Sequence, residues 1–208
     1  MGLDLNAGML GVARTLPSEG APIDWIEGSA LDLPFTPGNF HVVLCQQGLQ
    51  FFPDRGQALR EMRRVSVGFG RIAVSVYSTI ERTPGANAFA LALDGVLGPG
   101  SSRIKRGEHA FADAGELETL LTNAGFRTID VQTVVQPIAF PSVLDYVRFQ
   151  LLATPMASLL VGEGESERQA IISAVAAKTA SFSTPALLDG GTFSFPQEAY
   201  VATARNSP

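Results

Sequence analysis

Apolar and polar residues follow two different periods along this chain. Residues 6–16 and 55–65 place apolar side chains three and four positions apart, which is the spacing of an amphipathic helix. Between them, Ile23–Glu27 and Phe40–Cys45 are short, mainly apolar runs of a length typical of strands. The second run is interrupted only by His41, and this predicts a strand that is covered on both faces.

The same alternation continues through the middle of the chain. A strand is predicted at Gly70–Tyr77, a helix at 113–125 and another strand at Arg127–Val135. Residues 81–111 interrupt this alternation of strands and helices, because glycines and prolines there lie on both sides of a short apolar helix. Strands that alternate with helices are typical of an α/β fold with a mostly parallel sheet.

The last part of the chain is predicted to hold two more helices and a closing strand. Residues 142–182 have helical spacing on either side of a glycine-rich turn at 162–164, and Ser166 is placed to cap the second helix. Segments 192–195 and 199–204 have the composition of the closing strand.

No repeat, low-complexity tract or linker divides the chain. We therefore expect one domain over residues 1–208, with cap-like excursions at about 81–111 and 142–190. At the first helix, Asn6 is expected to act as the N-cap and Pro17 to follow the end.

Composition narrows the classes of function. A net charge of -5 argues against a nucleic-acid partner, because no basic excess exists to neutralise phosphates. Arg60, Arg63 and Arg64 form the densest basic cluster, but Glu61 interrupts it, which favours a solvated helix face. One cysteine and two histidines predict neither an internal disulfide nor a metal site.

Membrane and targeting signals are not evident in the pattern. The first residues show no basic stretch followed by an apolar run, so no signal peptide is expected. Residues 33–53 lack charge but are broken by proline, glycine and glutamine, and 149–162 are too few to span a bilayer. We expect a soluble, cytoplasmic protein without a membrane span.

Asp4 is the first candidate for chemistry. An acid that follows a strand at the carboxyl edge of a parallel sheet can accept both ribose hydroxyls of a nucleoside. The alternative, left open, is an ordinary acid in the loop before the helix. The helix that follows contains Met9, whose side chain could either form an apolar wall of the binding site or pack in the core.

Three segments together resemble a known family. They are Gly2-Leu3-Asp4-Leu5-Asn6, Gly28-Ser29-Ala30-Leu31-Asp32-Leu33-Pro34-Phe35 and the run from Phe40 to Asp54. Their order and spacing resemble class I S-adenosylmethionine-dependent methyltransferases of the type allied to the ubiquinone and menaquinone biosynthesis enzymes. The resemblance implies a Rossmann-like, doubly wound sheet and S-adenosylmethionine as the cofactor.

The resemblance also implies roles for particular residues. Asp4 would hold the ribose of S-adenosylmethionine, and Leu5 and Met9 would form an apolar wall against the adenine. Ser29 and Ala30 occupy the adenine-binding positions, although the family usually has aspartate where Ser29 stands, and Asp32 is an alternative acceptor. Gln46 would contact the methionine part, with Gln50 facing the substrate; for each glutamine the alternative is a loop residue bonded to nearby backbone.

Some other positions differ from the family pattern, and one candidate nucleophile has no residue nearby to activate it. His41 stands where an aspartate is usual, and Gly68-Phe69 replace Pro-Gly in the turn after Arg64. Cys45 shows no neighbouring base that would activate it, so a buried structural role is expected.

The family's first strand and its glycine-rich loop would stand just before Asp4. The printed sequence contains no Gly-x-Gly-x-Gly, so we expect the sheet of this chain to lack its first strand. Such a sheet would leave unpaired strand edges, which another segment or a second subunit can fill. A homo-oligomer is therefore left open.

Three functions follow for testing. The leading one is methyl transfer from S-adenosylmethionine to a small, apolar or aromatic acceptor. Its catalytic residue is unassigned, because His109 and Tyr77 could act as a base but a structural or exposed role is favoured for each. The alternatives are an inactive, partner-binding pseudoenzyme and a nucleotide-dependent reductase. The reductase is the weaker of these, because the chain lacks the Tyr-x-x-x-Lys pair that such an enzyme would use. Acceptor selectivity is expected in the two excursions, where apolar side chains can roof a pocket or simply pack: Phe89, Leu93, Phe111, Tyr146 and Phe149.

Overall fold

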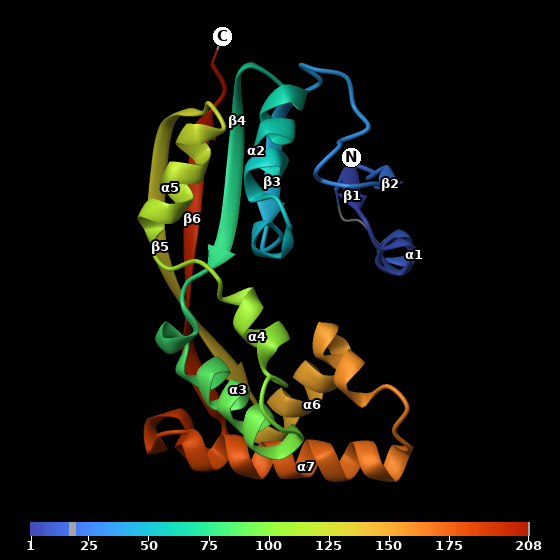
Figure 1. Cartoon of the computed structure of the whole chain (residues 1–208), viewed down its shortest axis with the longest axis vertical. Helices are drawn as coiled ribbons and strands as arrows, with labels where there is room; N and C mark the ends of the chain where they lie inside the picture. The colour runs from blue at the N-terminus through green and yellow to red at the C-terminus, as the bar shows by residue number, and fades with distance from the viewer. Residues whose placement is uncertain (17–19, 208) are drawn as a thin grey trace. The chain divides into compact units, whose positions relative to one another are not determined.

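The structure, a computed structural model, describes residues 1–16 and 20–207 (Figure 1). Pro17, expected just after the first helix, lies outside the described residues. The strands are β1 (Gly2–Asp4), β2 (Trp25–Glu27), β3 (Phe40–Gln46), β4 (Ser66–Tyr77), β5 (Arg127–Phe140) and β6 (Phe193–Arg205). The helices are α1 (Ala7–Thr15), α2 (Arg55–Val65), α3 (Pro84–Leu97), α4 (Arg103–Glu108), α5 (Ala114–Asn123), α6 (Val143–Ala153) and α7 (Glu165–Phe182).

The described strands form two sheets. β1 and β2 pair in parallel, and the other sheet has the order β3-β4-β6-β5 with β3 and β4 parallel. β6 runs antiparallel to β4, since the backbone of Ser78 bonds to Glu198 while that of Asn206 bonds to Gly70. Within the described residues, β1 and β3 therefore each have one unpaired edge.

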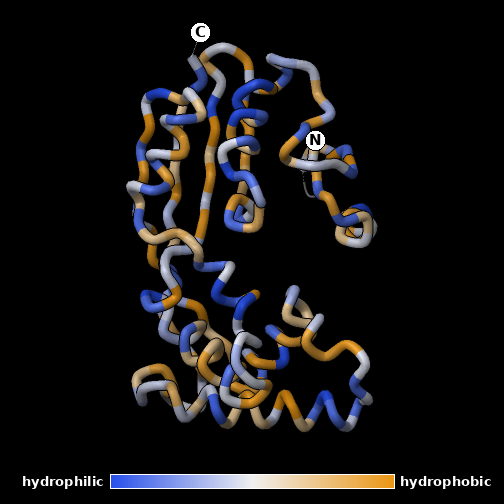
Figure 2. Tube along the Cα trace, viewed as in Figure 1, coloured by the Kyte–Doolittle hydropathy of each residue, from blue (hydrophilic) through white to orange (hydrophobic). Residues whose placement is uncertain are grey.

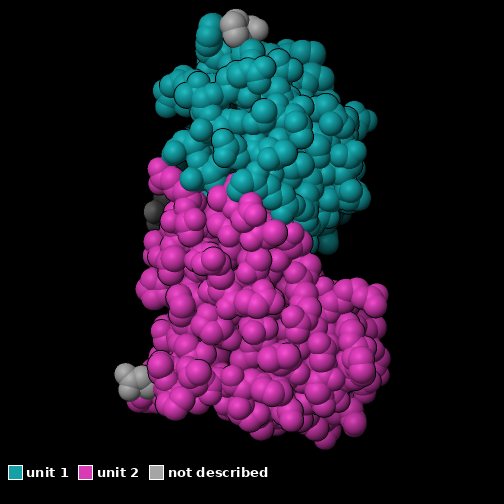
Figure 3. All heavy atoms as spheres, turned by 60° about the vertical axis from the view of Figure 1, so that its left-hand side comes forward, with its two compact units in different colours: residues 1–75, 115–131, 201–208 teal, residues 76–114, 132–200 magenta. Residues whose placement is uncertain are grey.

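The chain divides into two compact units, which Figure 3 colours separately. Unit 1 comprises residues 1–75, 115–131 and 201–208, and unit 2 comprises residues 76–114 and 132–200. Both stretches expected as cap-like excursions fall within unit 2. The single tryptophan, Trp25, belongs to unit 1, whereas all the tyrosines belong to unit 2; these are Tyr77, Tyr146 and Tyr200.

Unit 1 is held by its α2 and α5 helices and by β4. Figure 2 shows β4 as a largely hydrophobic trace, in keeping with its buried positions at Ile72 and Val74. The Arg55 guanidinium lies 2.9 Å from a carboxylate oxygen of Glu116 and so joins α2 to α5. Gly125 ends α5 with φ 93°, a left-handed conformation that favours glycine.

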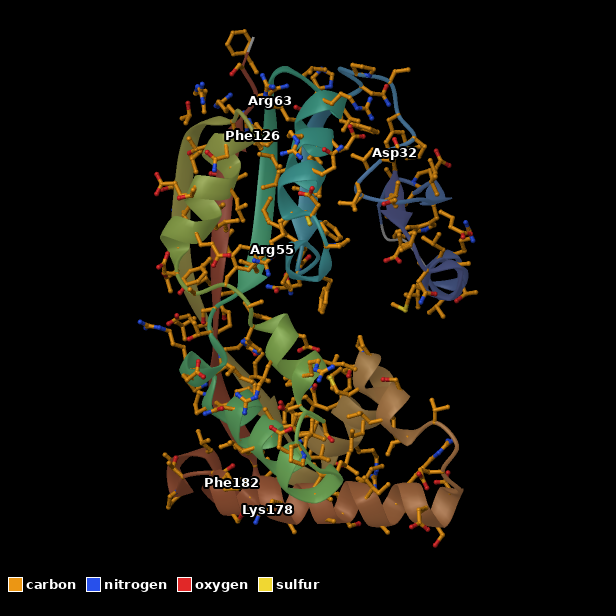
Figure 4. All side chains as sticks on the ribbon, in the orientation of Figure 1. Asp32, Arg55, Arg63, Phe126, Lys178 and Phe182 are labelled. Atoms are coloured by element: carbon orange, nitrogen blue, oxygen red, sulfur yellow. The ribbon has the colours of Figure 1, made fainter. Side chains whose placement is uncertain are left out.

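Unit 2 has its own aromatic core. Tyr146 of α6 packs against the rings of Phe89, Phe193 and Phe195, with ring centroids 5.2 to 5.6 Å apart. Helix α7 packs on both α3 and α6. On α7, Figure 4 labels Lys178 and Phe182, one turn apart, where the ammonium nitrogen lies 5.3 Å from the ring centroid.

Several element boundaries and one burial prediction differ from the structure. β3 was expected to be covered on both faces, but Val42 is 54% exposed and Leu44 is 71% exposed, so the face of β3 that carries these two side chains is open. The N-cap of α7 is Gly164 and not Ser166. β4 begins at Ser66, and the positions expected to form a turn are part of it, with Phe69 at φ 61°.

Candidate functional site

Asp4 lies at the carboxyl end of β1 and is exposed. Its carboxylate accepts a 2.7 Å hydrogen bond from the backbone N–H of Asn6, and the Asn6 side chain in turn caps α1 by accepting from Met9 at 3.1 Å. The strand-to-helix turn is thus fixed by two short polar side chains. It leaves the second carboxylate oxygen of Asp4 for a ligand.

The end of β2 lies beside the end of β1. Asp4 and Glu27 are register partners, and the N–H of Gly28 donates to the carbonyl of Asp4 at 3.0 Å. Ser29 follows in a tight turn, where its hydroxyl oxygen accepts from the backbone N–H of Leu31 at 3.1 Å. The structure therefore brings Asp4 and the Gly28–Ala30 segment to the same edge of one sheet.

The apolar side chains predicted to line the adenine are open to solvent. Leu5 is 74% exposed and Met9 is 61% exposed, whereas Leu10 on the same helix is 1% exposed. Met9 is therefore not a core residue, and its side chain is accessible at the start of α1. Its contact with adenine stays a prediction.

The segment after Ser29 is held by an ion pair on α2. Glu61 accepts from the backbone N–H of Leu33 at 2.8 Å, and Arg64 donates to the carbonyls of Leu33 and Phe35 at 2.8 and 2.7 Å. The two side chains also pair with each other at 2.7 Å. Arg64, interpreted from the sequence as part of a solvated face, in fact fixes the loop after β2.

Replacing Glu61 tests this loop anchor. Hydrogen bonding to Arg64 lowers the pKa of Glu61, so the carboxylate is ionised at neutral pH and the contribution is lost as pH falls through that lowered pKa. Glu61→Gln is expected to speed amide hydrogen exchange at Leu33 about tenfold, because a neutral amide accepts less strongly. Glu118→Gln, an exposed position of α5, is the matched control; equal exchange in both variants would contradict the role of Glu61.

Three glutamines gather at the carboxyl end of β3. Gln46 ends the strand opposite Ser75 and is exposed. Gln47 follows with φ 51°, a left-handed backbone that costs energy for a residue with a side chain. Gln50 is 6% exposed; its amide nitrogen donates to the Gln47 side chain at 3.2 Å, and within the described residues its Oε1 has no partner.

The glutamine cluster thus combines backbone strain with an unpaired buried acceptor. Both features are common where a ligand completes the structure, because a donor from the ligand then satisfies the orphan oxygen. Gln50 is the more informative residue for this reason, although the sequence had favoured Gln46. The neighbouring Cys45 is buried, and burial raises the pKa of its thiol, so it is not an activated nucleophile.

Unit 2 contains an open pocket of about 330 Å³. Its walls come from the segment after β4 and from the end of α4, and we refer to it as the His109 pocket; it is lined by Thr79, Ile80, Glu81, Arg106, His109, Ala110, Phe111 and Ala112. Of the apolar side chains expected to roof an acceptor pocket, only Phe111 is among these. Phe89, Leu93 and Tyr146 instead pack in the core of unit 2, while Phe149 is 48% exposed.

His109 is the notable polar group of this pocket. It is 6% exposed, stacks on Tyr77 with ring centroids 5.2 Å apart, and its Nδ1 lies 2.8 Å from the carbonyl oxygen of Ser78. Burial is the largest cause that lowers the pKa of His109 to about 4, and the charge of Lys105 lowers it further. The ring is therefore neutral at physiological pH.

Residues 1–16 and 20–207 contain no group of three or more histidine, cysteine, aspartate or glutamate side chains placed to hold a metal ion. None of their helices combines the length and the apolar character that crossing a bilayer requires.

Comparisons with known proteins find similarity to methyltransferases over the part of the chain that contains β1, β2 and β3. Residues 1–74 match the family described as methyltransferase domain. The chain is 31% identical over 142 residues to a chloroplastic 2-phytyl-1,4-beta-naphthoquinone methyltransferase of Arabidopsis thaliana, covering 62% of this chain and 54% of that protein. It is also 31% identical over 144 residues to a demethylmenaquinone methyltransferase of Lactococcus lactis, covering 64% of this chain and 57% of the relative.

A solved structure extends the likeness to the fold of the whole chain. Phosphoethanolamine N-methyltransferase 2 of Haemonchus contortus, in complex with phosphomonomethylethanolamine and S-adenosylhomocysteine, superposes with a TM-score of 0.56 at 15% identity. The superposition covers all of this chain and 43% of that protein. In sequence over residues 1–74 and in fold over its whole length, the chain resembles S-adenosylmethionine-dependent methyltransferases.

The chain spans little more than half the length of the curated relatives described above. Of the three segments on which the sequence resemblance rests, one contains β1, one follows β2 and one contains β3. Sequence reasoning missed the Glu61–Arg64 anchor and the orphan oxygen of Gln50. The first was signalled only by opposite charges three positions apart on a helix, and the second by no local pattern at all.

Proposed function

We propose that this protein transfers a methyl group from S-adenosylmethionine to a small aromatic acceptor of the quinone type. The observation that carries the proposal is the placement of Asp4 and Gly28–Ala30 at one edge of the β1–β2 sheet, within the segment that matches the methyltransferase domain. In this assignment Asp4 accepts the ribose hydroxyls, and Ser29 and Ala30 lie against the adenine.

The remaining candidate residues have complementary roles in this proposal. Leu5 and Met9 supply exposed apolar surface for the adenine ring, and Gln46 supplies an amide for the methionine part. Gln50 offers its buried, unpaired Oε1, which suits a donor such as an ammonium group. S-adenosylmethionine brings an electrophilic methyl group, so the work of the protein is to orient the acceptor and exclude water.

The quinone class of acceptor is supported by the names of the relatives. The Arabidopsis protein is a naphthoquinone methyltransferase and the Lactococcus protein a demethylmenaquinone methyltransferase. Both names describe acceptors with an apolar, aromatic ring system. The lining of the His109 pocket includes apolar side chains that suit such a ring.

Substitution of Asp4 tests the cofactor site. Asp4→Ala is expected to weaken binding of S-adenosylmethionine by about 1.5–3 kcal/mol, the range for hydrogen bonds to a charged group. Asp24→Ala is the matched control, because Asp24 precedes β2 and so lies at the opposite, amino-terminal edge of the same two-stranded sheet. Isothermal titration calorimetry measures both variants.

The titration is run on two forms of the protein. One is the 208-residue chain, and the other is the same chain joined at Met1 to a strand and a Gly-x-Gly-x-Gly loop, since those glycines do not occur in the printed sequence. If neither form binds S-adenosylmethionine, the proposed function is overturned. If a form binds but Asp4→Ala changes nothing, the function stands and the assignment of Asp4 is wrong.

A further inference from the structure

The hydrogen bond to Ser78 determines which ring nitrogen of His109 carries the proton. The carbonyl oxygen of Ser78 can only accept a hydrogen bond, so the Nδ1 atom 2.8 Å away carries the proton in the neutral ring. The other ring nitrogen, Nε2, then presents a lone pair. It is a hydrogen-bond acceptor of fixed direction, because stacking on Tyr77 holds the ring plane.

This acceptor is unsatisfied. Nε2 is buried and has no hydrogen-bond partner among the described residues, although His109 lines an open pocket. A buried acceptor left without a donor is destabilising, so Nε2 needs a donor from outside the chain, either an ordered water or the group of a ligand that replaces it. Since Nε2 itself has almost no contact with solvent, a ligand reaches it only when a side chain of the pocket wall moves aside.

The charges around the ring restrict the kind of donor. On α4, Lys105 is paired with Glu108 at 2.7 Å, and Arg106 lies in the pocket lining with Glu81, which precedes α3. The lining thus contains one charge of each sign, beside apolar side chains from Ile80 and Phe111. A neutral ligand with an apolar ring and a hydroxyl donor fits this combination better than a charged one.

We propose that His109 Nε2 accepts a hydrogen bond from the hydroxyl group of a phenol or hydroquinone ring bound in the His109 pocket. The inference rests on the proposed function, because it assigns the acceptor to a particular pocket and its hydroxyl to a particular atom. The reduced, hydroxyl-bearing form of a quinone-type ring can donate this hydrogen bond, whereas the oxidised form has only carbonyl acceptors. His109 therefore selects the reduced form.

The test uses the presence of two histidines in the whole chain, His41 and His109. The protein is produced with isotope-labelled histidine, and the ring nitrogens are followed by nuclear magnetic resonance during titration with β-naphthol or with its methyl ether. We expect β-naphthol to shift the Nε2 signal of His109 and to leave the exposed His41 unchanged. The methyl ether, which has no donor, is expected to bind about 3- to 10-fold more weakly and to leave Nε2 unshifted.

Variants separate the hydrogen bond from the shape of the pocket. His109→Phe is expected to remove the preference for β-naphthol over its ether, while His41→Gln is expected to keep it. Equal binding of the two probes to the unsubstituted protein, or a β-naphthol complex with an unchanged Nε2 signal, would overturn the inference even if His109→Phe fails to fold. Because neither probe requires S-adenosylmethionine, failure of cofactor binding and failure of this inference are distinguishable.

Discussion

Leu93→Ala is expected to lower the free energy of unfolding by about 2–5 kcal/mol. Leu93 lies on α3, is 0% exposed and belongs to the apolar cluster of unit 2 together with Val147 and Ile172. Removing its side chain leaves a cavity among residues that belong to three different helices. Urea denaturation followed by circular dichroism measures the effect, since helices dominate that signal.

Leu91→Ala supplies the matched control on the same helix. Leu91 is 40% exposed, and the exchange of leucine for alanine alters intrinsic helix propensity equally at both positions. We expect a loss of less than about 1 kcal/mol, because little buried apolar area disappears. Equal losses for the two variants would mean that α3 does not pack into the core by the face that carries Leu93.

Gly85→Ala is expected to destabilise the protein by about 1–3 kcal/mol, although alanine is the better helix former. Gly85 lies in the first turn of α3, and a Cβ atom there would overlap the ring of Phe195. Phe195 is 3% exposed and packs against Tyr146 and Phe193, so its ring has little room to move. Thermal denaturation reports the change in stability.

The opposite sign is expected for a glycine with open surroundings. Gly107 lies in α4, is exposed, and a Cβ atom there would meet nothing within 4 Å. Gly107→Ala should stabilise the protein by about 0.4–1 kcal/mol, because it restricts the unfolded chain without a clash. Stabilisation by both substitutions would show that Phe195 yields readily and that the contact is not tight.

Much of the secondary structure could be predicted because its signals are local. The Asn6 cap, the apolar spacing of residues 55–65 and the glycine after α5 each lie within a few positions of the element they define. β3 was predicted to be buried on both faces because its run of apolar residues is typical of a central strand. Whether both faces are covered depends on the elements that pack against the strand, and the sequence of the strand does not contain that information.

In the candidate site, too, features with a local sequence signal could be predicted, and features that depend on distant contacts could not. Asp4 and the Gly28–Phe35 segment could be found because a family pattern places them at fixed spacing. Arg64 could not be assigned from a local pattern, since its partners in the loop are 29 and 31 residues away in sequence. The tautomer of His109 likewise depends on a carbonyl 31 residues away, and only the folded chain brings the two together.

Trp25 lies in unit 1 and every tyrosine lies in unit 2, so the intrinsic chromophores of the chain report on the two units separately. Excitation at wavelengths that tyrosine does not absorb selects Trp25 and follows unit 1, whereas the absorbance of the tyrosines follows unit 2. Denaturation recorded with both signals therefore shows, without any added dye, whether the two units unfold together or one after the other.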